Sequence, residues 1–276
     1  MHLGATLALL RAHSGLTLRG LAAQVGVSAA YLSRVEHGHD PAPTGERAVA
    51  IADALGLPRP LLLNLIDEVR GDATDWLRAT PTGRRLASAL RRRRLTEAQL
   101  ARILAIVERE LPLDPEDRPA GLGALVHPSR ALLRVRASRL EEVWTLATMR
   151  LAEGAQATAL LEELRREERS QTACVGAQTV ISFARAGADA PRACLVHCVS
   201  PLPLPTPDAA PPRAVWVLAG VSAGAAGADA LVSAAHLADE GLVRALQDAT
   251  CGAEVVALVE QLERQGFIGR REHRTN

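Results

Sequence analysis

The feature that most constrains this chain is the run of residues 15–38, in which one glycine separates two short amphipathic segments. Thr17 precedes the first segment and Ser28 precedes the second, and both are residue types that cap helix N-termini. Gly26 lies between the segments, where a tight turn favours glycine. Leu21 and Ala22 are placed for close packing of the two helices. The pattern predicts two short helices that pack at an angle across a tight turn.

The flanking residues extend this pattern into a small helical domain. Leu3, Leu7 and Leu10 have helical spacing, which predicts a first helix over residues 3–13. After Gly38 we expect a fourth helix, capped by Thr44, and a fifth helix that Pro60 opens. Residues 1–70 are therefore predicted to form one all-α domain.

These residues resemble the Cro/C1 (XRE) family of helix-turn-helix transcriptional regulators. The matching positions are Arg11, Gly15, Leu16, Thr17, Leu21, Ala22, Gly26, Val27, Ser28, Tyr31, Leu32, Ser33, Arg34, Glu36, Gly38 and Pro41. The resemblance implies a double-stranded DNA partner and a homodimer on a palindromic operator, probed by the helix that starts after Ser28. It also implies an ion pair between Arg11 and Glu36, with two independent solvated charges as the alternative.

By the same resemblance, the DNA-binding candidates are Thr17, Arg19, Ser28, Ala29, Ala30, Tyr31, Ser33, Arg34 and His37. Arg34 is the candidate for a bidentate contact to guanine. Ala29 and Ala30 can meet only thymine methyl groups, so direct base recognition should be modest.

Other positions in this domain leave alternatives open. Leu18 stands where the family often has a phosphate-binding glutamine, so that contact is absent. Tyr31 either contacts a phosphate or packs against the domain. His37 and His39 either contact phosphates or are plain exposed side chains.

Charge is distributed unevenly along the chain. Residues 1–70 contain six arginines and six acidic side chains, whereas residues 71–112 contain nine arginines and five acidic side chains. A near-neutral DNA-binding domain attracts phosphates weakly, so we expect it to need help from geometry, helix N-termini and dimerisation. Residues 71–112 have helical patterns and are predicted to be a helical connector. The run Arg91–Arg94 is either a solvated helix end or a phosphate clamp.

The second half changes character after a Pro- and Gly-rich stretch, the predicted linker 113–128. A helical pattern covers 140–168, and β-like runs follow at 177–183, 193–199 and 214–218. Helical patterns return at 228–237, 241–249 and 253–265, before a polar tail, 268–276, that we expect to be flexible. The predicted fold class is multi-domain: an all-α helix-turn-helix domain, a helical connector, and an α/β domain over 129–267.

This α/β part resembles the EIIA domain of the fructose/mannitol/nitrogen class of the sugar phosphotransferase system. The supporting pieces are Leu140–Leu164, Arg166–Glu167, Thr172, Ala184–Arg185, LVHCVSPLPL, VWVLAG and DEGLVRAL. That family phosphorylates a histidine, but Phe183 stands at its position here and Ser182 has no evident base beside it. We therefore expect a non-catalytic sensor or dimerisation domain. The alternatives are a phosphotransferase-type enzyme, or a protein-interaction module, with a DNA-binding appendage.

One further set of potentially reactive side chains, Cys194, His197 and Cys198, lies on one predicted strand. Structural packing is one interpretation, and metal or redox sensing is the other. No metalloprotease, P-loop or dinucleotide motif occurs, so we expect no catalytic residue, no metal, no cofactor and no enzymatic activity. No long apolar run or signal peptide is evident, so we expect a cytoplasmic protein that does not bind membranes. A regulatory protein or a small molecule is the expected signal at the C-terminal domain.

Overall fold

The computed structural model of this chain describes residues 2–70, 80–93, 95–111, 121–176, 178–188, 190–205, 210–238 and 240–266. Five helices form the N-terminal part: α1 (Leu3–His13), α2 (Leu18–Val25), α3 (Ala29–Glu36), α4 (Glu46–Leu55) and α5 (Arg59–Arg70). Two local predictions are confirmed, since the side chains of Thr17 and Ser28 cap α2 and α3. Gly26 takes the left-handed conformation, with a φ of 72°. The predicted Thr44 cap is wrong, because Gly45 occupies the N-cap of α4 and no side chain caps that helix.

The C-terminal part contains a five-stranded mixed sheet in the order β1-β4-β5-β3-β2. Its strands are β1 (Val126–Val135), β2 (Thr172–Gly176), β3 (Thr179–Phe183), β4 (Arg192–Cys198) and β5 (Ala214–Ala219). β1 pairs in parallel with β4, and β3 pairs in parallel with β5, while β4–β5 and β2–β3 are antiparallel. Every residue of β3 and β5 is buried, as expected for central strands covered on both faces.

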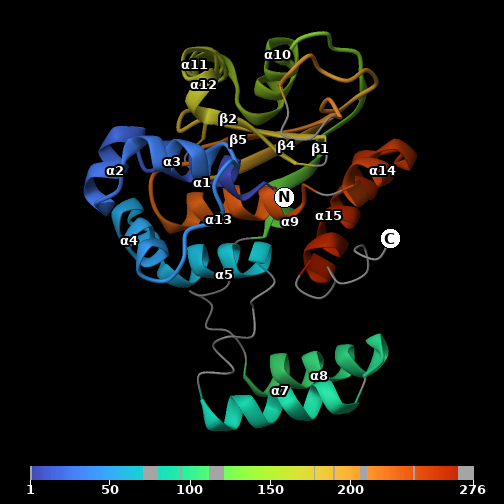
Figure 1. The fold of residues 1–276 in the computed structure, drawn as a ribbon. Helices are drawn as coiled ribbons and strands as arrows, with labels where there is room; N and C mark the ends of the chain where they lie inside the picture. Colours follow the sequence, from blue (N-terminus) through green and yellow to red (C-terminus); the bar gives the residue numbers. More distant parts are fainter. Residues whose placement is uncertain are drawn as a thin grey trace.

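Different helices cover the two faces of the sheet (Figure 1). α10 (Leu140–Leu151) and α11 (Gly154–Arg166) cover one face, where Trp144 packs in a core with Val180 and Val217. The opposite face carries α9 (Leu122–Leu125), α13 (Ala225–His236), α14 (Glu240–Asp248) and α15 (Gly252–Gly266). A short helix, α12 (Glu168–Gln171), leads from α11 into β2.

The N-terminal helix α1 belongs to both halves of the molecule. Leu3, Leu7 and Leu10 pack in one continuous hydrophobic core with Phe183 and Trp216 of the sheet. Figure 1 shows α1 beside α13, beneath the strands. The helix-turn-helix part is therefore packed directly on the α/β part.

A separate helical hairpin consists of α7 (Pro81–Arg93) and α8 (Glu97–Glu110). In Figure 1 it lies beyond α5, on the side away from the sheet. Thr96 begins α8 with a capping box in which Gln99 is the partner. The hairpin includes much of the predicted connector, 71–112, while residues 71–79 lie outside the described residues.

Several elements differ from the sequence expectation. The predicted helix over 140–168 is broken, because Ala152 and Glu153 adopt extended backbone angles between α10 and α11. β1 and β2 were not predicted, since only Val126 of β1 is buried, which leaves no regular alternation, and β2 is short. The last part of the predicted linker 113–128 forms α9 and the start of β1. Most of that linker, 113–120, and the predicted tail, 268–276, lie outside the described residues.

Candidate nucleic-acid interface

The helix α3 presents a solvent-facing side on the surface of the N-terminal part. Among the predicted DNA-binding residues, those that are exposed are Thr17, Arg19, Ser28, Ala30, Arg34 and His37, and those that are half-buried are Ala29, Tyr31 and Ser33. The opposite side of α3 is buried through Leu32, Val35 and Glu36. The structure thus brings the predicted residues onto α3 and the neighbouring start of α2.

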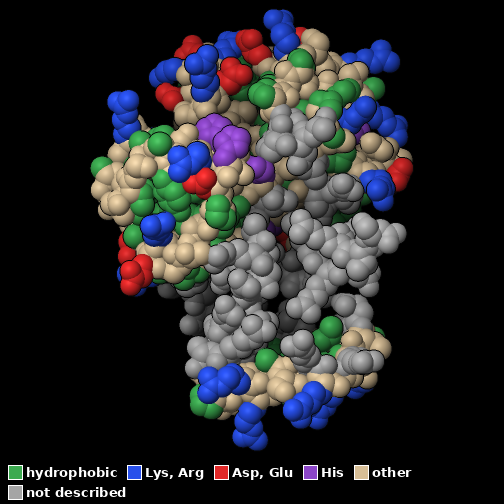
Figure 2. Space-filling model, in the orientation of Figure 1, with side chains coloured by type: hydrophobic (Ala, Val, Ile, Leu, Met, Phe, Trp, Pro, Cys, Tyr) green, Lys and Arg blue, Asp and Glu red, His purple; other side chains and the backbone are tan. Residues whose placement is uncertain are grey.

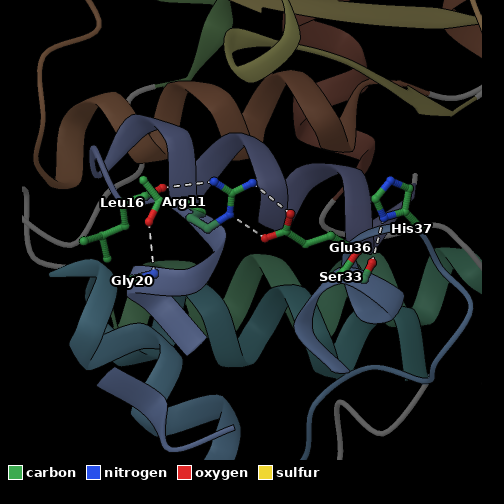
Figure 3. Close-up of polar contacts among 7 residues, drawn as sticks. Arg11, Leu16, Gly20, Ser33, Glu36 and His37 are labelled. Atoms are coloured by element: carbon green, nitrogen blue, oxygen red, sulfur yellow. Dashed lines mark hydrogen bonds and ion pairs between the residues drawn. The ribbon is translucent and has the colours of Figure 1, made fainter. Parts of the chain in front are cut away.

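Arg11 and Glu36 form the ion pair that the resemblance implied (Figure 3). Arg11 Nε donates to Glu36 Oε1 at 2.6 Å, and Nη2 donates to Oε2 at 2.9 Å. Arg11 Nη1 also donates to the carbonyl oxygen of Leu16, between α1 and α2. The Glu36 side chain is only 5% exposed, so this bidentate pair is largely shielded from water. It connects the first helix to the C-terminal end of α3 and fixes the angle of that helix.

Arg34, the predicted guanine contact, is held by a residue that the sequence did not single out. Its Nε donates to both carboxylate oxygens of Asp40 at 3.1 Å. Arg34 remains half exposed in this pair. Because both bonds use Nε, they leave unoccupied the Nη groups that can also form a bidentate contact to a guanine edge. Asp40 is a positioning residue for Arg34.

Tyr31 packs beneath an arginine of the next helix. The guanidinium of Arg47, from α4, lies 5.4 Å from the centre of the Tyr31 ring, a cation–π arrangement. This contact supports the interpretation that Tyr31 packs against the domain. A contact between the Tyr31 hydroxyl and a phosphate stays a prediction. Arg47 is exposed and adds a cation beside α3. Sequence reasoning missed it because it lies outside the helix-turn-helix motif.

Histidines surround the C-terminal end of α3. His37 Nδ1 lies 2.7 Å from the carbonyl oxygen of Ser33, and its ring stacks on that of His39 with 6.2 Å between centroids. The His2 ring lies against Gly38, where a Cβ atom would meet it. Figure 2 shows this group as purple side chains beside the N-terminal helices. Phosphate contacts by His37 and His39 stay a prediction.

The resemblance to EIIA domains places Phe183 at the position of a phosphorylated histidine, with Ser182 next to it, and both residues are buried. Ser182 is fully buried, and its hydroxyl oxygen accepts hydrogen bonds from Trp144 Nε1 at 3.0 Å and Thr172 Oγ1 at 3.1 Å. Phe183 is also fully buried, and its ring meets His13 of α1 edge-on. The helix-turn-helix part therefore covers this position.

Cys194 and Cys198 pack in the core between the sheet and α10, on the face opposite to His197. Burial raises the pKa of the Cys194 thiol to about 12 and that of the Cys198 thiol to about 11. Thiols with such pKa values stay protonated at neutral pH, which disfavours metal binding. In the part of the chain that is described, no three His, Cys, Asp or Glu side chains form a group that could hold a metal ion.

Comparison with known proteins gives a match for each half of the chain. Residues 2–65 match a family described as a helix-turn-helix domain, which indicates DNA binding. The C-terminal half resembles the crystal structure of the nitrogen regulatory protein IIA-Ntr from Neisseria meningitidis. That likeness has a TM-score of 0.43 and 19% sequence identity, and covers 50% of this chain and 98% of the other. At this level the resemblance concerns the fold alone and says nothing about a shared activity. No curated protein matches the chain.

None of the described helices is both long and apolar enough to cross a bilayer.

Proposed function

We propose that this chain is a sequence-specific transcriptional regulator, a repressor, that binds a palindromic operator as a homodimer in the cytoplasm. The observation that supports this most directly is the exposed side of α3, which a buried ion pair between Arg11 and Glu36 holds at a fixed angle. In a helix-turn-helix protein the second helix enters the major groove with its N-terminal residues toward the bases. Ser28, Ala30 and Arg34 occupy that side of α3.

The proposal assigns a non-catalytic regulatory role to the α/β half. Ser182 and Phe183, the nearest equivalents of a phosphoryl acceptor, are buried, and Ser182 already accepts two hydrogen bonds. A buried hydroxyl that acts as an acceptor is not available for nucleophilic attack. A regulatory protein or small molecule that bound this half would act on α1 through the shared hydrophobic core.

The experiment that tests the proposal selects bound DNA from a random pool with the full chain, then repeats the selection with Arg34→Ala. We expect an enriched palindrome whose half-sites lie about 34 Å apart along the duplex. Arg34→Ala should lose the preference at one position of each half-site, at a cost of ~1–3 kcal/mol in discrimination.

Arg59→Ala is the matched control, because it removes the same charge from an exposed arginine on α5. It should keep the full sequence preference. If the wild-type chain enriches no sequence, the proposed function is wrong. Uniform weakening by Arg34→Ala, with every preference kept, would instead assign Arg34 to a phosphate.

A further inference from the structure

The helix α7 gathers arginines on one side. A hollow of about 890 Å³ is bordered by α7, and its described lining residues are Pro81, Arg84, Arg85, Ser88, Ala89, Arg92 and Arg93. Residues separated by three, four, seven or eight positions share one side of a helix. Two adjacent arginine pairs therefore lie about two turns apart on one side of α7. We call these four side chains, Arg84, Arg85, Arg92 and Arg93, the arginine face.

The arginine face concentrates positive charge without acidic neighbours on its own helix. Residues 81–93 contain five arginines and no aspartate or glutamate. The four side chains of the face are exposed. Figure 2 shows arginine side chains along the edge of the molecule where α7 lies. Like charges close together on a helix destabilise it, and a bound polyanion would reverse that cost.

A partner on the apolar side of the same helix would leave the middle of this face uncovered. Leu86 is 49% exposed and does not line the hollow. It lies seven positions before Arg93, so a partner packed on Leu86 would lie beside Arg93. Arg85 and Arg92 lie further round the helix and would stay accessible to an anion in a dimer formed through Leu86.

We propose that the arginine face of α7 is a second DNA contact, which binds the phosphate backbone of the duplex. This inference rests on the proposed function, since the helix-turn-helix domain would bring DNA to the molecule. The two arginine pairs are separated by about 11 Å along the helix. That is about the axial length of three nucleotides of one strand. Guanidinium groups also match phosphate geometry with paired hydrogen bonds.

The need for such a contact follows from the charge of the N-terminal part. Residues 1–70 carry as many acidic side chains as arginines, and Leu18 removes one family phosphate contact. Phosphate neutralisation supplies most of non-specific DNA affinity. The arginine face would supply the net positive charge that residues 1–70 lack.

The test measures binding of the full chain to a random-sequence duplex of roughly 30 base pairs, a length of about three helical turns, over a series of salt concentrations. The variant is Arg85→Gln with Arg92→Gln, which removes one arginine from each pair. We expect its affinity at low salt to fall about tenfold or more, and its slope of log affinity against log salt to become shallower by about 2. Circular dichroism checks that the variant keeps its helices.

Arg102→Gln with Arg109→Gln is the matched control, because it removes the same charge from exposed arginines of α8 in the same hairpin. It should keep the wild-type slope. An unchanged slope in the α7 variant, or an equal loss in both variants, would overturn the inference. Failure of the DNA selection with a shallower α7 slope would reject the proposed function alone, and an operator bound with an unchanged α7 slope would reject this inference alone.

Discussion

At the residue scale, the geometry of the interface depends on one ion pair that is almost removed from water. The Glu36 side chain is 5% exposed and that of Arg11 is 16% exposed. Removing two charges from water is costly, and paired hydrogen bonds offset that cost only while both partners are present. The pair between Asp53 and Arg59 has similar geometry, but both of its side chains are largely exposed. Water screens exposed pairs, so they contribute little.

We expect Glu36→Ala to lower the free energy of unfolding by about 3 kcal/mol, because it leaves the Arg11 guanidinium buried without its partner. The measurement is the midpoint of urea unfolding, followed by circular dichroism. Asp53→Ala is the control and should leave the midpoint almost unchanged. Equal shifts in the two variants would show that burial does not set the contribution of the Arg11 pair.

Local residue types predicted the caps at Thr17 and Ser28 and the turn at Gly26, because each depends on neighbours within a few positions. The contacts of Arg34 with Asp40 and of Tyr31 with Arg47 were not predicted. Both join α3 to residues beyond its end, and spacing along the chain does not reveal where those residues return in space.

At the element scale, α1 is held at both ends by the α/β half. The backbone N–H of His2 donates to the carbonyl oxygen of Val175 in β2 at 2.6 Å. At the other end, Arg185 Nη2 donates to the carbonyl oxygens of Ala12 and His13. A cation at those carbonyls also suits the negative end of the helix dipole. These bonds explain why α1 packs as part of the sheet's covering layer.

His13 is the titratable side chain at this contact. Its Nε2 lies 2.8 Å from the carbonyl oxygen of Ser222, so the neutral ring donates from Nε2. Its Nδ1 is buried and has no hydrogen-bond partner among the described residues. Burial lowers the pKa of His13 below its ordinary value of 6.5, and the positive charge of Arg185 acts in the same direction.

Because the folded state binds the His13 proton less readily than the unfolded state, its neutral form contributes stability that is lost as the pH falls below about 6.5. We expect His13→Gln, which keeps an N–H donor for Ser222, to flatten the fall in urea midpoint between neutral pH and about pH 5. The exposed His37→Gln is the control and should keep the wild-type pH dependence. His197, whose pKa burial also lowers, is present in both variants. A His13→Gln profile parallel to that of the wild type would contradict the role of His13.

At the scale of the whole molecule, the apolar surface that remains exposed is concentrated on the separate hairpin. Eight large apolar side chains of the described residues are exposed, and five lie in residues 80–111: Leu86, Leu100, Ile106, Val107 and Leu111. A helical hairpin with such a face gains stability by packing against a second apolar surface. A second copy of the chain would supply that surface, and would also supply the second recognition helix that a palindrome needs.

We expect the wild-type chain to sediment at twice its monomer mass, and Leu100→Glu with Val107→Glu to sediment as a monomer, because a charge on each apolar side chain opposes its burial. Leu146→Glu with Met149→Glu is the control on α10, whose side chains are also exposed. It should remain dimeric. A wild-type monomer at micromolar concentration would reject the dimer, and a monomer only in the α10 variant would place the interface on the α/β domain.

The helix-turn-helix motif could be predicted from local residues alone, since its caps, turn glycine and apolar spacing act over short stretches of chain. The three inner strands could be predicted in the same way, because their apolar runs reflect burial on both faces. That α1 covers the sheet depends on contacts between distant residues, because one helix can bury several of its sides against different partners. Thr6, Leu9 and His13 extend the buried surface of α1 beyond the Leu3, Leu7 and Leu10 stripe, and all three are buried. Their spacing along α1 cannot predict which residues, more than a hundred positions away in the chain, pack against them.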